Sequence, residues 1–305
     1  MRTRARIVAF AIAALVLPAA ARADEPPAPV APSAEPVPGC LGPSLRWDPE
    51  WRRFETGEGV VTGVAAAITL TTAIVPPLSK HRYGGVLFDE DARDTFRLPS
   101  VGGRFAARDT SDAILSVLAT SPYFVDAAIL AWWYRGSRDV ARQMSLIALE
   151  SMAVAGAIQG VTNFLVSRER PYARGCGGEV PGLTTDCEDP GRFRSFFSGH
   201  SVLSFTSASL ICSNHTAFDL LGGPWDASAC VLAYAAAATT ASLRVMGDMH
   251  YATDVLTGSV IGTVVGLGIP ALHYRRVGAG KDGDPSAARV YVVPTGTGAA
   301  VGGIF

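Results

Sequence analysis

Six long apolar segments recur along the sequence, and they constrain the fold more than any other feature. Their length and their content of alanine, leucine and valine favour helices over strands. No strand-rich region of comparable size accompanies them, so we predict an all-α fold built as a bundle of about six helices. The segments are residues 58–79, 111–134, 142–166, 200–217, 228–245 and 254–274.

The apolar segments are long enough for a lipid bilayer. Residues 60–79 contain no charged side chain, and 20 residues is the length that a spanning helix requires. The chain is 49% hydrophobic and only 17% charged, whereas soluble domains carry about 25% charged residues. Asp112, Asp126 and Glu150 lie within other segments and should therefore face the bundle interior. We predict a membrane-embedded bundle; a soluble bundle is the alternative.

The N-terminal 23 residues have the organisation of a secretory signal peptide. Basic residues precede an apolar core, and "ARA" ending at Ala23 suits cleavage, although an uncleaved membrane anchor is the alternative. Residues 24–50 form a linker whose prolines prevent regular structure. The helical domain should then occupy residues 51–275. Residues 276–305 form a short non-helical tail, in which "VYVV" and glycines predict a short strand and a turn.

Five cysteines in an exported chain make disulfides plausible. Cys176 and Cys187 lie in one loop and are the best candidate pair, and Cys212 and Cys230 flank another connection and come second. Cys40 would be left over. The sequence contains neither the C-x-x-C nor the H-E-x-x-H pattern of zinc sites, so we predict no metal ligands.

Three short motifs follow one another in the second half of the chain. The first ends an apolar segment, the second precedes the next one, and the third lies between the last two. They comprise Arg170 and Pro171, then Ser198, Gly199 and His200, and finally Arg244, His250 and Asp254.

The residue types of these motifs suit a phosphate group. The planar guanidinium groups of Arg170 and Arg244 match phosphate oxygens in pairs. A helix that starts after Ser198 would add backbone N–H groups and its dipole, and Gly199 would let the backbone approach the ligand closely. The formal net charge of −1 provides no global field for nucleic acid, so the anion site must be local.

The third motif also suits nucleophilic catalysis. His250 and Asp254 are spaced i and i+4, so they share one face if that stretch is helical. The carboxylate can then hold one ring nitrogen and leave the other free to attack. Arg244 would be off that face in an unbroken helix, so we expect Gly247 and Asp248 to break the helix between them.

Together, the three motifs resemble those of the type 2 phosphatidic acid phosphatase and vanadium haloperoxidase superfamily, in its bacterial membrane-associated phosphatase branch. The family pattern is K-x6-R-P, then P-S-G-H, then S-R-x5-H-x3-D. The resemblance extends over roughly residues 110 to 272 and implies a helical bundle. The chain departs from the pattern at three positions. Asn163 replaces the lysine, Phe197 the proline and Leu243 the serine.

The resemblance implies a role for each motif residue in a phosphatase that needs no metal and no cofactor. His250 would attack phosphorus to form a phosphohistidine, with Asp254 orienting it, and His200 would protonate the leaving oxygen. The remaining residues would bind phosphate oxygens, with Asn163 in the lysine position. They are Arg170, Arg244, Ser198, Gly199 and Asn163.

We expect a hydrolase of phosphomonoester or pyrophosphate groups, on lipid or polyprenyl phosphates. A vanadate-dependent haloperoxidase and a non-catalytic protein that binds an anionic headgroup are the alternatives, and Asn163 bears on both because it brings no charge. The resemblance implies a cell-envelope protein, either in the inner membrane with a periplasmic site or soluble in the periplasm. Three crossings from an exported N-terminus would leave Arg170 in the cytoplasm, so these expectations conflict in part.

Overall fold

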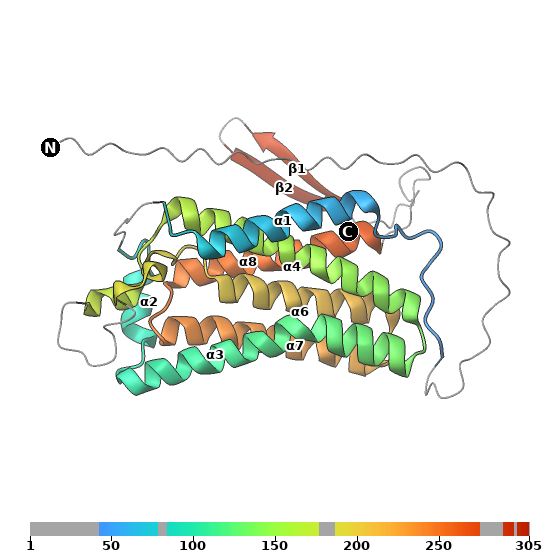
Figure 1. The fold of residues 1–305 in the computed structure, drawn as a ribbon, viewed down its shortest axis with the longest axis horizontal. Coiled ribbons are helices and arrows are strands. Elements are labelled where there is room, and N and C mark those ends of the chain that lie inside the picture. Colours follow the sequence, from blue (N-terminus) through green and yellow to red (C-terminus); the bar gives the residue numbers. More distant parts are fainter. Residues whose placement is uncertain (1–42, 79–83, 177–186, 275–288, 296–297, 305) are drawn as a thin grey trace. The chain divides into compact units, whose positions relative to one another are not determined.

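The computed structural model describes residues 43–78, 84–176, 187–274, 289–295 and 298–304. The predicted signal peptide, most of the linker and Cys40 lie outside the described residues. The fold is all-α, as predicted (Figure 1). A π-helical segment, Pro122–Tyr134, continues α3 directly. The six long helices are α1 (Thr56–Ile74), α3 (Val101–Ser121), α4 (Arg138–Val166), α6 (Gly199–Phe218), α7 (Pro224–Met246) and α8 (Ala252–His273).

The long helices alternate in direction along the chain (Figure 1). α1 and α4 run parallel, because Phe54 N donates to Gln143 before α1 and Leu78 N donates to the carbonyl of Phe164 after it. α3 and α7 run antiparallel, since Leu98 N donates to the carbonyl of Met246. One end of the bundle therefore holds the ends of α1, α4 and α7 together with the starts of α3, α6 and α8. We call it the motif end and the opposite one the far end.

One helix begins earlier than the sequence predicts, and one helix was not predicted at all. α3 begins at Val101, ten residues earlier than expected, because Arg104, Arg108 and Asp109 interrupt the apolar pattern of its first turns. A short helix, α2 (Asp89–Phe96), was not predicted. Its sequence, DEDARDTF, is too polar to be found by hydrophobic periodicity.

Helix α6 is the centre of the bundle and contacts α3, α4, α7 and α8. Three glycines of α8 lie directly against its backbone. A Cβ atom added at Gly258, Gly262 or Gly266 would lie 2.8, 2.3 or 2.5 Å from a carbonyl oxygen of α6 or its N-cap. Only glycine fits these positions, so the two helices, which carry residues of two motifs, pack at a close and fixed distance.

Among the residues that the structure describes, five helical segments are long and apolar enough to span a membrane: α1, α3 with its π-helical extension, α4, α7 and α8. Many large apolar side chains on them face outward, including Val64, Leu70, Trp133 and Val264. Such an extended apolar surface is typical of a protein surrounded by lipid. α6 is not among the five, because its serines make it less apolar and its neighbours cover it.

The structure confirms two further predictions. Cys176 pairs with Cys187 at the motif end, and Cys212 pairs with Cys230 within α6 and α7. The tail contains a hairpin of two antiparallel strands, β1 (Arg289–Thr295) and β2 (Gly298–Ile304).

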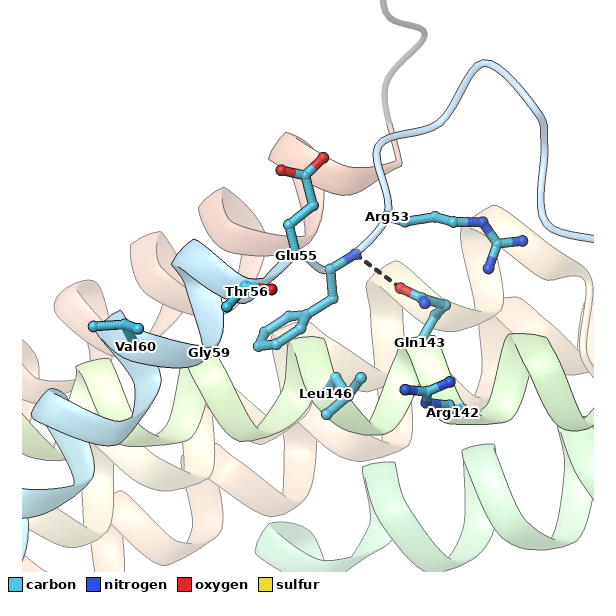
Figure 2. A pocket seen from close by; sticks show the side chains of 9 residues that line it. Arg53, Glu55, Thr56, Gly59, Val60, Arg142, Gln143 and Leu146 are labelled. Atoms are coloured by element: carbon cyan, nitrogen blue, oxygen red, sulfur yellow. Dashed lines mark hydrogen bonds between the residues drawn. The ribbon is translucent and has the colours of Figure 1, made fainter. Parts of the chain in front are cut away.

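A cavity of about 650 Å³ lies at the far end, between the start of α1 and the first turns of α4 (Figure 2). Arg53, Phe54, Arg142 and Gln143 are among its lining residues. None of the motif residues lines it. The candidate site formed by the three motifs therefore lies at the motif end and not in this cavity.

Candidate active site

Four helix ends bring the three motifs together at the motif end. α4 stops at Val166, and Ser167 adopts a left-handed conformation with φ 51° that turns the chain into Arg170 and Pro171. α6 starts after Ser198, whose hydroxyl accepts a hydrogen bond from Ser201 N. The third motif extends from the end of α7, which carries Arg244, through the connection with His250 to the start of α8, which carries Asp254.

The expected helix break after Arg244 is present, but His250 itself lies outside a helix. α7 ends at Met246, and α8 begins only at Ala252. Asp248 has φ 60° and is buried, held by Arg93 of α2 and by Arg97, the residue that follows this helix. His250 and Asp254 therefore do not share a helical face, as the spacing had suggested. The tight turn brings the ring to the carboxylate instead.

The ring of His250 is held by a backbone carbonyl. Its Nδ1 lies 2.8 Å from the carbonyl oxygen of Ser195 and 3.8 Å from Asp254 Oδ2. A carbonyl oxygen can only accept, so Nδ1 carries the proton and Nε2 keeps its lone pair. Burial lowers the pKa of His250 to about 3, an effect opposed by Asp254 and reinforced by Arg170. The ring is thus neutral at physiological pH, with Nε2 free to act as a nucleophile.

The carboxylate of Asp254 is fully buried and saturated with donors. Ser195 Oγ lies 2.6 Å from Oδ2, and Tyr251 N lies 3.0 Å from the same oxygen. Arg168 donates to Oδ1 at 2.5 Å and also to Asp89 at 2.8 Å. Arg168 is itself buried, so the three charged groups form one enclosed network behind His250. The network fixes Asp254 as an anion.

Arg244 and Arg170 make the front of the site electropositive. Arg244 is buried and donates from Nη1 to Ser111 and Asp112. Its Nε is also buried and makes no hydrogen bond among the described residues. Arg170 lies close enough to act electrostatically on Arg244, His200 and His250. A buried guanidinium with an unused donor suits an anionic ligand.

The start of α6 supplies part of the predicted anion cradle. Ser198 is buried, and its N–H donates to the backbone carbonyl of Asp254, so this N–H is not available to a ligand. The N–H groups of Gly199 and His200 make no hydrogen bond within the described part of the chain, as expected for the first turn of a helix. These two groups can receive an anion.

His200 is paired with a residue of α3 that the motifs did not include. Its Nε2 lies 2.6 Å from Asp112 Oδ1, and the same oxygen accepts from Arg244 Nη1 at 2.7 Å. The pair is partly exposed, with side-chain exposures of 25% for His200 and 57% for Asp112. His200 thus lies near Arg244, which can donate to a phosphate group, at the solvent-exposed edge of the site.

Asn163 lies behind the second motif. It is buried, and its Nδ2 donates to the backbone carbonyl of Phe197 at 3.0 Å and to that of Gln159 at 3.3 Å. Phe197, in the family's proline position, is buried in a cluster with Ala155 and Val202. The Asn163 amide group therefore supports the turn that presents Gly199.

The geometry agrees with a comparison of sequences. The profile of the PAP2 superfamily matches residues 145–277, which include all three motifs. This part of the chain is therefore similar to the PAP2 superfamily, as the three motifs had indicated. The PAP2 superfamily carries phosphatase-type or haloperoxidase-type activities. No curated protein and no solved structure matches the chain.

Four residues of the candidate site were not identified by the sequence analysis: Asp89, Asp112, Arg168 and Ser195. Arg168 lies two residues before Arg170 of the first motif, but it binds Asp254 rather than facing the phosphate-binding arginines. Asp89 and Asp112 lie outside the matched stretch, in helices whose polar residues form no recognisable motif. The signal that the sequence offered was the presence of Asp112 in an otherwise apolar segment, which predicted a charge facing the bundle interior. The Asp112 carboxylate does contact His200 and Arg244, but it remains 57% exposed.

Proposed function

We propose that the protein is a metal-independent phosphatase that works through a phosphohistidine. The observation that carries this proposal is the state of the His250 ring, which is buried and neutral. Its Nδ1 is hydrogen-bonded to a backbone carbonyl, so Nε2 keeps its lone pair and lies near two arginines. A nucleophile of this kind suits attack on phosphorus. The similarity of this part of the chain to the PAP2 superfamily supports the same chemistry.

In the first step, His250 Nε2 attacks phosphorus as the bond to the leaving oxygen breaks, and His200 donates a proton to that oxygen. In the second step, His200 removes a proton from a water molecule, which attacks phosphorus and releases His250 and inorganic phosphate. Arg170 and Arg244 hold the equatorial oxygens, on which the transition-state charge lies. Ser198 and Gly199 shape the turn whose N–H groups assist them.

Asp254 orients the attacking ring and stabilises the positive charge that His250 acquires when it bonds to phosphorus. Arg168 and Ser195 keep the carboxylate in place. Asn163 contributes by holding the Phe197 carbonyl, next to the phosphate-binding turn. In this scheme the missing lysine charge weakens phosphate binding but leaves the nucleophile intact.

We propose a phosphorylated lipid or polyprenyl as the substrate. Five segments can span a membrane, and the catalytic groups lie at the ends of these helices, near the depth of lipid headgroups. A substrate anchored in the same bilayer would reach this end by lateral diffusion. We assign the protein to the cell envelope, with the site on the periplasmic side.

The test is phosphate release by purified full-length protein in detergent, in the presence of EDTA. Phosphatidic acid, a polyprenyl pyrophosphate and p-nitrophenyl phosphate should be compared, and the protein should be quenched in alkali, because phosphohistidine is labile in acid. Release with alkali-stable labelling supports the proposal. Halide oxidation with vanadate and peroxide would indicate a haloperoxidase, and binding of phosphate without turnover would indicate a non-catalytic protein.

A further inference from the structure

One carboxylate at the site belongs to none of the three motifs. Asp112 lies in α3, 88 residues before His200 and outside the stretch matched by the superfamily profile. A single oxygen of Asp112 accepts from His200 Nε2 at 2.6 Å and from Arg244 Nη1 at 2.7 Å. One acidic side chain therefore joins the expected acid catalyst to a phosphate-binding arginine.

This contact decides which atom of His200 can serve a substrate. With Nε2 directed to Asp112, Nδ1 is the nitrogen left for the leaving oxygen. A carboxylate at this distance also favours the doubly protonated ring, which is the form that an acid catalyst needs. Burial opposes protonation of His200 most strongly, and Arg244 from α7 and Arg170 from the segment after α4 add to this effect, so that the pKa of His200 is lowered to about 4. Asp112 is the group that counters them.

We propose that Asp112 is a positioning residue that aims Nδ1 of His200 at the leaving group and favours the protonated ring over the neutral one; this inference rests on the phosphatase function proposed above. In the first step, the Nδ1 proton moves to the leaving oxygen as its bond to phosphorus breaks, and the Nε2 proton stays on the bond to Asp112. The neutral ring then has its lone pair on Nδ1, where it can accept a proton from the attacking water.

The partial exposure of the pair fits this role. Asp112 is open to solvent while Arg244 beneath it is buried, so water can reload the proton between turnovers. The Asp112 carboxylate contacts both His200 and Arg244. An experiment must therefore separate its effect on acid catalysis from its effect on phosphate binding. Substrates with different leaving groups provide that separation.

The experiment compares Asp112→Asn with wild type on p-nitrophenyl phosphate and on an alkyl phosphate. The aryl leaving group needs little protonation, whereas the alkoxide needs it fully. We expect the rate constant of the first step, phosphorylation of the protein, to fall about 30-fold on the alkyl ester and less than about 3-fold on the aryl ester. The alkaline limb of the kcat profile should move to lower pH by about one unit, because the asparagine does not stabilise the charged ring. Asp112→Glu should recover part of the loss.

Asp109→Asn is the matched control, since Asp109 lies one turn earlier on α3 and is exposed. It should leave both substrates and the pH profile unchanged. Equal losses on both substrates with an unmoved pH profile, or a rise in KM alone, would overturn the inference and leave Asp112 as a support for Arg244. Melting temperatures of the variants identify misfolding.

A further measurement does not depend on turnover. The ring nitrogens of His200, followed by NMR in labelled protein, should lose their proton at lower pH in Asp112→Asn than in wild type. An unchanged midpoint would overturn the inference even if activity falls. An active wild type with these negative results would refute only the role of Asp112, whereas a wild type that releases no phosphate would refute the phosphatase function and this inference together.

Discussion

The two histidine–aspartate pairs of the site differ mainly in their access to water. His250 and Asp254 have exposures of 2% and 0%, and the ring is bonded to a backbone carbonyl rather than directly to the carboxylate. His200 and Asp112 have exposures of 25% and 57%, and ring and carboxylate are in direct contact. The same two residue types therefore meet two different environments.

The difference indicates how the proposed mechanism can use one type of side chain, histidine, both as nucleophile and as acid. Burial keeps His250 neutral, which a nucleophile requires. Burial lowers the pKa of His200 too, to about 4, but direct contact with Asp112 opposes this effect, and the partial exposure of the pair lets it exchange protons with solvent. Environment rather than residue type divides the roles, as in other enzymes that use two like groups.

Loss of the buried pair should have the largest effect. His250→Ala removes the attacking atom, so turnover should fall by about 10⁴-fold or more, and no alkali-stable phosphate label should form. The assay is phosphate release together with labelling by a radioactive substrate. Retention of wild-type labelling in this variant would refute the nucleophile assignment and remove the contrast between the pairs.

His200→Ala should be less severe and should depend on the substrate. Loss of a general acid costs about 10²- to 10⁴-fold, but an aryl phosphate partly bypasses the first step. The second step still lacks its base, so phosphorylated protein should accumulate with p-nitrophenyl phosphate. Burst kinetics measure this accumulation. Equal slowing of labelling and dephosphorylation on the aryl substrate would contradict the assignment.

Asp254→Asn should reduce turnover by about 10²-fold, because it disturbs orientation without removing the attacking atom. It also leaves the buried guanidinium of Arg168 with one carboxylate instead of two. We therefore expect a lowered melting temperature as well, unlike in Asp112→Asn. Calorimetry on the two variants tests whether the buried pair is the one that matters for stability.

Asn163→Lys should affect phosphate binding by about ten-fold. A charged donor beside the phosphate-binding turn should lower the inhibition constant of phosphate by about that factor, since a charge-assisted bond contributes roughly 1.5–3 kcal/mol. Inhibition and melting temperature should be measured on the same sample. Unchanged inhibition with a lower melting temperature would mean that Asn163 acts only as support for the Phe197 carbonyl.

The smallest expected effect concerns the distance between the two pairs. Gly258→Ala places a methyl group 2.8 Å from the Ser198 carbonyl oxygen. The start of α6, which carries His200, should therefore move away from α8, which carries Asp254. Turnover should fall several-fold. Gly268→Ala is the control on the same helix, because a Cβ there meets nothing within 4 Å. It should be neutral or slightly stabilising. Equal behaviour of both variants would contradict the fixed-distance argument.

Much of this architecture could be predicted from the sequence. Apolar periodicity locates the six long helices, and the spacing of the motifs identifies the residues that meet at the motif end. Both disulfides follow from cysteine positions. These features depend on short stretches of chain, where residue spacing translates directly into geometry.

The partners of the catalytic residues could not be predicted in this way. Asp112 is 88 residues from His200, and Asp89 is 79 residues from Arg168. No local pattern encodes such contacts, because they arise from the packing of α2 and α3 against the motif end. The tautomer of His250 depends on the Ser195 carbonyl, a backbone group that residue types do not specify.

The alternation of the long helices has a consequence for where the ends of the domain lie. The chain enters α1 and leaves α8 at the far end, so in a fully spanning bundle the two flanking segments share one compartment and the catalytic residues face the other. The Cys176–Cys187 disulfide lies at the motif end and requires an oxidising compartment. In such a bundle, a periplasmic motif end would place both flanks in the cytoplasm, so the predicted export of the N-terminus and the proposed periplasmic site exclude each other. A reporter fused after His273 reads the side of both flanks and, by difference, that of the catalytic histidines.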